Sequence, residues 1–266
     1  MALHYFTDQQ FTPLVVSSVL LIFSVLLFTK ERTKPALVFL FLGALGLGYF
    51  IANLDPFLVL WDEQYHALVA KSMMKDPFKP TLYAIPVLEY DHTQWASNHI
   101  WLHKQPLFLW QMALSLKLFG ISEFAIRVPS IILHAFAALL IYRIGKISVS
   151  AAVGYCGALF FTVAYYPLEM VAGKYATDHN DQIFLCYVTA SFWAWFEYTA
   201  SKKWYWVVLT GLLAGCAVLV KWLPGLLVFG AWFVSLGAED RKNWLRLKAY
   251  LPLAAAAIVA FVVFLP

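Results

Sequence analysis

Eight stretches of this sequence are long, apolar and almost free of charge, and this repetition restricts the fold more than any other feature. Crossing a hydrocarbon core of about 30 Å takes about 20 helical residues, and these stretches approach that length. Hydrophobic residues make up 62% of the chain, whereas a soluble domain has about 45–50%. A backbone in lipid must form helices or a closed barrel. Barrel strands alternate in hydrophobicity with a period of two, and these stretches do not. We therefore predict an all-α membrane protein, a polytopic bundle of transmembrane helices.

The connections between the apolar stretches differ in charge, and this difference predicts the orientation of the chain. Alternate short connections hold eleven of the 19 basic residues. Short loops rich in Lys and Arg stay in the cytoplasm, so the other connections are expected outside. The N-terminus is expected there too, unless the first apolar stretch fails to span. About eight spans are predicted, at residues 14–29, 36–54, 127–142, 151–168, 182–199, 206–220, 223–236 and 250–265. The eleven basic residues are Lys30, Arg32, Lys34, Arg143, Lys146, Lys202, Lys203, Arg241, Lys242, Arg246 and Lys248.

The long connection at residues 55–124 is predicted to be an ordered polar cap on the outer face. It is rich in acidic residues and histidines, and it shows no repeat or low-complexity segment. The pieces 64–74 and 106–119 are amphipathic, as in helices that lie at a membrane interface. We expect residues 1–266 to form one transmembrane module in the inner or plasma membrane.

An acidic pair, Asp62 and Glu63, directly follows the second predicted span. A carboxylate at the boundary between lipid and water is partly desolvated, and such a group suits general-base chemistry. The alternative is structural, because Asp also caps the N-terminus of helices, here one starting near Glu63. For the pair taken alone the structural alternative is favoured, since helix caps are common and catalytic acids are rare.

Lys104 lies just ahead of Pro106, where the second amphipathic helix is predicted to start. Its ammonium group is placed to meet a lipid phosphate, and the positive end of the helix dipole would add to the attraction. The alternative is an interfacial lysine that reaches into water. The spacing of His92, His99 and His103 matches no recognised zinc motif, so no metal is indicated and a divalent cation is the weaker option.

The short outer loop at residues 173–181 crowds two carboxylates, a lysine and a histidine. Charged groups at the membrane boundary are functional candidates by default, and here the functional interpretation is preferred. The alternative has Asp181 capping the next span and Asp178 in solvent. The candidates in this loop are Lys174, Asp178, His179 and Asp181.

Other charged residues lie at the ends of spans or inside them. Lys221 ends an uncharged run, so it either reaches into water or faces an anionic ligand. Arg127 is similar, and for it a structural role is about as well supported. We expect packing or interfacial roles for His134 and Glu197.

These clusters, in this order and on one predicted side, resemble the membrane glycosyltransferases of the GT-C fold. The branch that looks most similar contains protein O-mannosyltransferases and the aminoarabinose transferases of lipid A. The resemblance covers residues 53–266, and each motif is weak on its own. The matching elements are Asp62-Glu63, Lys104-Gln105-Pro106, Arg127-Val128-Pro129-Ser130, Asp181 or Asp178, and Val220-Lys221-Trp222.

The sequence also departs from the pattern of the family it resembles. His103 stands where the family has an acidic residue, Gln105 replaces the first Pro of the pair, and Trp222 replaces a Gly. An additional span precedes the usual first one. Members of that family commonly continue through more spans and a soluble domain, so we expect this chain to be the N-terminal part of a longer one.

The resemblance implies transfer of a sugar from a polyprenyl-phosphate donor to an envelope acceptor on the outer face, with inversion. In it Asp62 would act as general base, with Glu63, Asp178 and Asp181 as further catalytic candidates. Lys104, Lys174 and Lys221 would bind the donor phosphate, and His103, His179 and Tyr65 would contact substrate. We expect membrane lipid as a partner and no nucleic acid. The alternatives are a transporter or flippase of anionic or lipid-linked substrates, and a non-catalytic subunit of an envelope complex.

Overall fold

The computed structural model describes residues 7–60, 62–83, 85–86, 89, 91, 93, 98–174, 179–239 and 246–265. Over these residues the regular elements are helices, and one isolated β-bridge joins Thr81 to Ile100. The predicted all-α fold class is therefore confirmed. The chain divides into two compact units, residues 1–139 with 158–183 and residues 140–157 with 184–266.

The first unit begins with a helical hairpin of α1 (Asp8–Thr29) and α2 (Thr33–Ala52). A capping box starts α1, because the Thr7 side chain accepts from the Gln10 N–H and the Gln10 side chain accepts from the Thr7 N–H. The two helices pack closely where α2 has a glycine. A Cβ added at Gly43 would lie 2.6 Å from Leu21 Cδ2.

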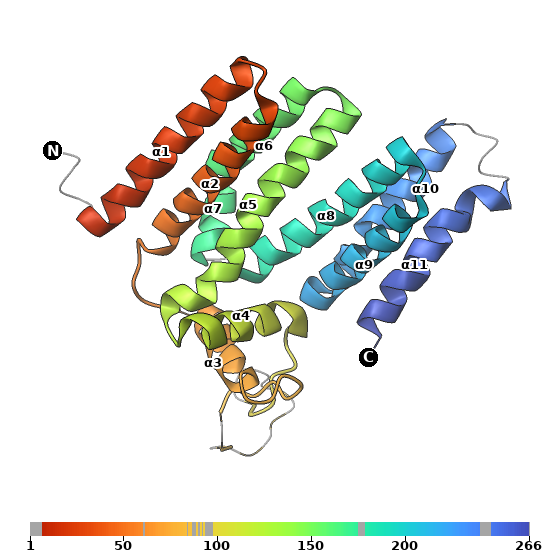
Figure 1. Cartoon of the computed structure of the whole chain (residues 1–266). Helices are drawn as coiled ribbons and strands as arrows, with labels where there is room; N and C mark the ends of the chain where they lie inside the picture. The colour runs from red at the N-terminus through yellow and green to blue at the C-terminus, as the bar shows by residue number, and fades with distance from the viewer. Residues whose placement is uncertain are drawn as a thin grey trace. The chain divides into compact units, whose positions relative to one another are not determined.

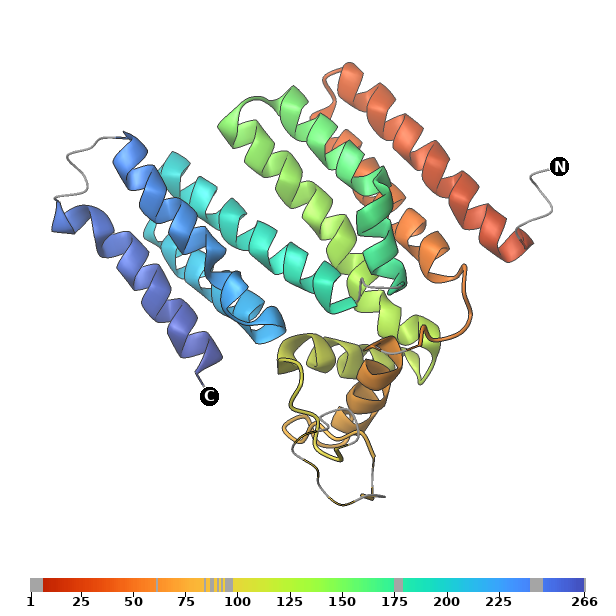
Figure 2. The same cartoon turned by 180° about the vertical axis from the view of Figure 1, so that it is seen from behind.

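Two shorter helices, α3 (Asp62–Met73) and α4 (Pro106–Phe119), lie beyond the ends of α1, α2 and α5 in the first unit (Figure 1). Both views place them on the side where α2 ends and α5 begins, away from the Lys30–Arg32 turn (Figure 2). Pro106 is the first residue of α4, a position at which proline costs no helical hydrogen bond. The predicted helices at 64–74 and 106–119 are thus present, and α3 starts two residues earlier.

The next apolar stretch is broken rather than continuous. The predicted span 151–168 forms α6 (Ala151–Val163) and α7 (Tyr165–Ala172), which are bent by 48°. Ala164 between them has an extended backbone, with φ −67° and ψ 138°. Because Pro167 lies in the first turn of α7, its missing N–H removes no helical hydrogen bond. The preceding α5 (Glu123–Ser148) is longer at both ends than the predicted span 127–142.

The second unit contains most of α8 (His179–Ser201), together with α9 (Trp204–Lys221), α10 (Leu227–Glu239) and α11 (Leu251–Phe264). Short 3₁₀ turns, Leu223–Leu226 and Leu247–Tyr250, precede α10 and α11. Its core is built around Trp195 and Trp232, with Ala256 and Ala260 of α11. In Figure 2 α9 and α11 run side by side, and small residues such as Gly211 allow the close approach.

Among the described residues, five helices are long and apolar enough to cross a membrane, or six if the bent pair of α6 and α7 forms one span. The predicted number of about eight is not confirmed. The predicted span 182–199 lies in α8, which has the length but carries Asp181, Gln182 and Glu197. The predicted span 223–236 is shorter still, because it divides into a 3₁₀ turn and the 13-residue α10.

Candidate active site

Arg127 is the centre of a buried polar cluster in the first unit. The side chain projects from α5, is 2% exposed, and uses all five of its N–H donors. Two donors bind the Glu63 carboxylate, at 2.8 and 3.1 Å. The others bind the carbonyl oxygens of Ala52, Asp55 and Phe57, at 2.6, 2.6 and 2.8 Å. A single guanidinium group therefore fixes the path of the chain from the end of α2 to the start of α3.

The Glu63 carboxylate likewise forms a full set of hydrogen bonds. Besides the two bonds from Arg127, it accepts from His179 Nε2 at 2.8 Å and from the Val59 N–H at 2.6 Å. Burial raises the pKa of this carboxyl group, but the hydrogen bonds and charges of His179 and Arg127 outweigh it, so the pKa lies below its ordinary value of 4.5. Glu63 is ionised at neutral pH, and its acceptor positions are occupied.

His179 and Gly173 complete this cluster. Since an ionised Glu63 can only accept, the proton in their hydrogen bond belongs to His179 Nε2. The opposite nitrogen, Nδ1, lies 3.0 Å from Ser130 Oγ of α5. Gly173 ends α7 in the left-handed conformation, with φ +67°, and a Cβ there would lie 2.7 Å from His179 Nε2. Glycine is thus required both by the backbone angle and by the approach of His179.

Asp62, one residue before Glu63, has a different environment. Its side chain is 29% exposed, and its Oδ2 lies 3.4 Å from Lys104 Nζ, whose side chain is 21% exposed. Tight charge-assisted N–H···O bonds measure about 2.7–2.9 Å, so this pair is loose. The capping alternative for Asp62 is not supported, because α3 begins at Asp62 itself and its side chain is directed to Lys104. The sequence groups Glu63 with Asp62 as catalytic, whereas in the structure Asp62 is partly exposed and Glu63 is buried.

An aromatic anchor brings Lys104 to the start of α3. Trp101 is 1% exposed and stacks on Tyr65 of α3 at 5.4 Å between ring centroids. Backbone hydrogen bonds from Trp101 to Pro80 and from Leu82 to His99 join the segments on either side of the β-bridge. Because Trp101 is fixed on α3 in this way, Lys104, three residues later, is held beside Asp62.

Two predicted substrate-binding residues, His103 and Tyr65, lie near the pair of Asp62 and Lys104. His103 is exposed, and its ring lies edge-on to Trp101 at 5.6 Å. Partial burial and the charge of Lys104 lower the pKa of His103 below its usual 6.5, so it is mainly neutral at pH 7. Tyr65 is half-buried beneath Trp101. The structure brings His103 to Asp62 and Lys104, whereas Tyr65 supports the anchor.

The beginning of α8 carries further predicted residues. Asp181 lies in its first turn and is half-buried, two residues after His179, so it is inside the helix rather than its N-cap. The contact of His179 with Glu63 brings the first turns of α3 and α8 together. Asp178 lies outside the described residues. Lys174 is half-buried just after α7.

Lys221 belongs to the second unit. It is the last residue of α9, and it is exposed. A different charged pair links the helices of that unit, with the Arg143 guanidinium group bound to the Glu197 carboxylate. Trp193 Nε1 also donates to Glu197, at 3.1 Å. Glu197 therefore has the packing role that the sequence indicates.

Sequence reasoning missed three polar residues of the first unit. Ser130 was noticed only as part of a motif, although its hydroxyl group lies against His179. Asn180 and Gln182, in the first turn of α8, are 1% and 0% exposed. Among the described residues, the Asn180 amide nitrogen and both polar atoms of the Gln182 amide find no hydrogen-bond partner. The run of amide and acidic side chains after Asp178 is the sequence feature that could have indicated Asn180 and Gln182.

The chain matches the model of one protein family over most of its length. The family model of dolichyl-phosphate-mannose-protein mannosyltransferases matches residues 103–266, more than half of the sequence. The chain belongs to this family. A curated relative, an uncharacterised protein of Aquifex aeolicus (strain VF5), is 26% identical over 192 residues, which is 71% of this chain and 35% of the relative. The chain therefore spans about a third of the length of that relative.

Two solved structures share the fold. ArnT from Cupriavidus metallidurans in the apo state aligns with a TM-score of 0.66 and 20% identity, over 86% of this chain and 40% of that one. The archaeal oligosaccharyltransferase AglB from Archaeoglobus fulgidus, in complex with an inhibitory peptide and a dolichol-phosphate, aligns with a TM-score of 0.56. Its identity is 14%, over 86% of this chain and 28% of that one. These similarities confirm the GT-C fold that the motifs predict, and with it an integral membrane protein.

Proposed function

We propose that this protein is a glycosyltransferase that moves a sugar from a polyprenyl-phosphate donor to an envelope acceptor, a lipid, glycan or protein, on the outer face of the membrane. The observation that carries the proposal is the loose pair of Asp62 and Lys104, a carboxylate and an ammonium group at 3.4 Å, both partly exposed. Family membership supports the reaction class. The dolichol-phosphate in the AglB structure belongs to the lipid class proposed as carrier.

Asp62 and Lys104 suit different parts of the reaction, Asp62 the acceptor and Lys104 the leaving phosphate. In the proposed step Asp62 takes the proton of the acceptor hydroxyl or amine, and the acceptor atom bonds to the anomeric carbon. The bond from that carbon to the phosphate oxygen breaks, and the polyprenyl phosphate leaves with the electron pair. Attack from the face opposite the phosphate inverts the anomeric centre. A positioned general base contributes about 10²–10⁴-fold to such a rate.

Lys104 would act on the donor phosphate. An ammonium group near the leaving phosphate stabilises the charge that develops there, and such electrostatic stabilisation is usually the largest catalytic contribution. When a phosphate binds, Lys104 exchanges the carboxylate for it, which releases Asp62 to accept a proton. His103, neutral beside Lys104, adds a hydrogen-bonding group for donor or acceptor. Lys174, Asp178 and Asp181 are proposed as further contacts to the donor phosphate or the sugars.

The buried cluster would act through position rather than contact. Glu63 bonds to both His179 and Arg127, and Glu63 and His179 are fully buried, so they hold the start of α3, and with it Asp62, in place. A rigid second layer of this kind is what a general base needs to stay within reach of the acceptor.

Purified protein in a lipid bilayer mimic tests the proposal, with radiolabelled polyprenyl-phosphate sugars as donors and a membrane extract as the source of acceptor. Release of polyprenyl phosphate and labelling of an acceptor are expected. Lys104→Ala should weaken donor use about 10- to 100-fold, because a hydrogen bond to a charged group contributes about 1.5–3 kcal/mol. Lys79→Ala, at an exposed lysine of the same connection, is the matched control and should leave donor use unchanged.

Two results would contradict the proposal. If folded Lys104→Ala uses the donor as the wild type does, the phosphate role is wrong. If the wild type moves labelled lipid between leaflets but transfers no sugar, the flippase alternative replaces the enzyme.

A further inference from the structure

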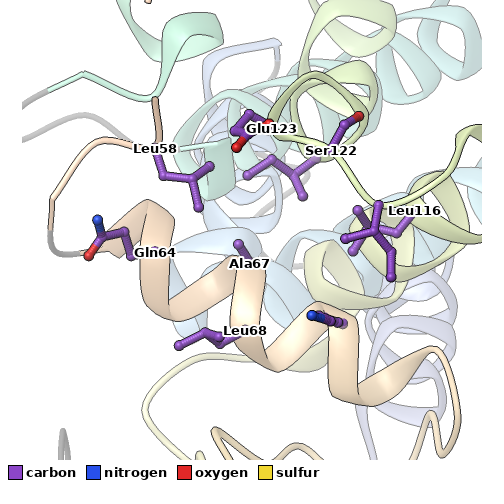
Figure 3. A pocket seen from close by; sticks show the side chains of 10 residues that line it. Leu58, Gln64, Ala67, Leu68, Leu116, Ser122 and Glu123 are labelled. Atoms are coloured by element: carbon purple, nitrogen blue, oxygen red, sulfur yellow. The ribbon is translucent and has the colours of Figure 1, made fainter. Parts of the chain in front are cut away.

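A pocket of about 360 Å³ opens in the first unit between α3, the end of α4 and the start of α5 (Figure 3). Pockets that hold small molecules usually measure about 300–1,000 Å³. On α3 it is lined by positions 64, 67, 68 and 71, whose spacing of three and four puts them on one helix face. Figure 3 shows Ala67 directed from α3 toward Leu58 and Glu123. The pocket lies on a different face of α3 from the buried residues Glu63 and His66.

The walls of the pocket are mainly apolar, and part of this apolar lining is exposed. Leu68, Leu116 and Ile126 form much of the lining. Two of the apolar lining residues are themselves exposed, Leu68 of α3 at 41% and Ile121, just after α4, at 62%. Short helices at the ends of membrane-spanning helices, as α3 and α4 are, belong at the depth of the interfacial region of a bilayer. The occupant therefore reaches the pocket from lipid.

Two opposite charges stand at the same pocket. Lys71, near the end of α3, and Glu123, the first residue of α5, both line it and both are exposed. The headgroup of a zwitterionic phospholipid carries a phosphate and an ammonium group a few atoms apart. Such a headgroup complements this pair, whereas a purely anionic headgroup would meet Glu123 with like charge.

We infer that the pocket is a binding site for a zwitterionic aminophospholipid of the surrounding membrane. Its phosphate pairs with Lys71, its ammonium group pairs with Glu123, and the upper part of one acyl chain lies along Leu68 and Leu116. The site is separate from Asp62 and Lys104, neither of which lines it. The inference rests on the pocket itself, and it stands or falls independently of sugar transfer.

Native mass spectrometry of the full chain, titrated with phosphatidylethanolamine or phosphatidylglycerol of the same acyl chains, tests the inference. The wild type should bind phosphatidylethanolamine more tightly. Glu123→Gln should reduce that preference about two- to fivefold, and Lys71→Gln should weaken both lipids by a similar factor, as for partly exposed ion pairs. Lys75→Gln, at an exposed position two residues after the end of α3, is the matched control and should change neither.

A second variant fills the pocket without changing charge. Ala67→Trp should remove the bound lipid while circular dichroism and gel filtration remain those of the wild type. Equal binding of the two lipids by the wild type would overturn the inference. So would unchanged binding of phosphatidylethanolamine by folded Ala67→Trp.

Discussion

Each of the two units joins distant helices by an arginine–glutamate pair, and the two pairs differ in their surroundings. In the first unit the side chains of Arg127 and Glu63 are 2% and 0% exposed. In the second unit those of Arg143 and Glu197 are 41% and 10% exposed. The first pair is extended by His179 and four backbone groups, whereas the second gains one further donor, Trp193.

The comparison shows what a buried ion pair requires. Removing two charges from water costs several kcal/mol per ion, and only a nearly complete set of hydrogen bonds offsets that cost. The first unit provides such a set, and it lies one residue from Asp62. The second pair remains partly exposed near the ends of α5 and α8, so it needs no such set and contributes less to stability. We interpret the first cluster as the positioning framework of the site and the second as an ordinary link between helices.

Removing each glutamate is the strongest test of this comparison. Glu63→Ala leaves the Arg127 guanidinium group buried without its carboxylate, and we expect a loss of about 3–5 kcal/mol in unfolding free energy. Glu197→Ala, the matched control in the second unit, should lose about 0–1 kcal/mol. Thermal unfolding in one detergent, followed by circular dichroism, measures both. Equal losses would show that burial does not distinguish the pairs.

A second comparison between the units concerns glycines, Gly173 in the first unit and Gly230 in the second. Gly173→Ala places a Cβ against His179 Nε2 and forces alanine into the left-handed region, which costs about 1–3 kcal/mol. Gly230, inside α10 of the second unit, is a control of opposite sign, because a Cβ there meets no described atom within 4 Å. Gly230→Ala should therefore stabilise the protein by about 0.4–1 kcal/mol.

The collision with His179 can be separated from backbone strain by a double-mutant cycle. His179→Ala removes the ring that the new Cβ would meet, so Gly173→Ala should cost less in that background. Additive effects of the two substitutions would mean that Gly173 serves the backbone alone.

The smallest expected effect is on how stability changes with pH, because protonation removes the charge of Glu63 but leaves its side chain in place. The pKa of Glu63 is lowered on folding, so its contribution to stability is fully present above its ordinary value of 4.5 and is lost as pH falls through the folded pKa. The difference in Tm between wild type and Glu63→Gln should be constant from pH 7 to about pH 5 and narrow below it. A difference that widens on acidification would contradict the assignment.

The broad fold could be predicted from the sequence because apolar length and the basic connections leave few alternatives. The break between α6 and α7 could not, since Ala164 is an ordinary residue and Pro167 is also compatible with a helix start. Span counting was unreliable where polar residues enter a long helix, as Gln182 and Glu197 do in α8.

The candidate site was predictable in its residue types but not in its division of roles. Asp62 and Glu63 are neighbours with similar chemistry, and only the helical geometry of α3 turns one toward Lys104 and the other toward Arg127. The motifs pointed to Lys104, but the reason it reaches Asp62 is the stacking of Trp101 on Tyr65. Contacts between residues this far apart in sequence have no local signal.

The central claim is that Asp62 acts as the base while Glu63 only holds it in position. The turnover of Asp62→Asn, measured with a polyprenyl-phosphate sugar in protein whose Tm and donor binding match the wild type, tests it most directly. Asn keeps the size of the side chain and cannot take the proton, so we expect turnover to fall about 10²–10⁴-fold with folding intact. Wild-type turnover in folded, donor-binding Asp62→Asn would show that Asp62 is not the base and would contradict the proposed mechanism.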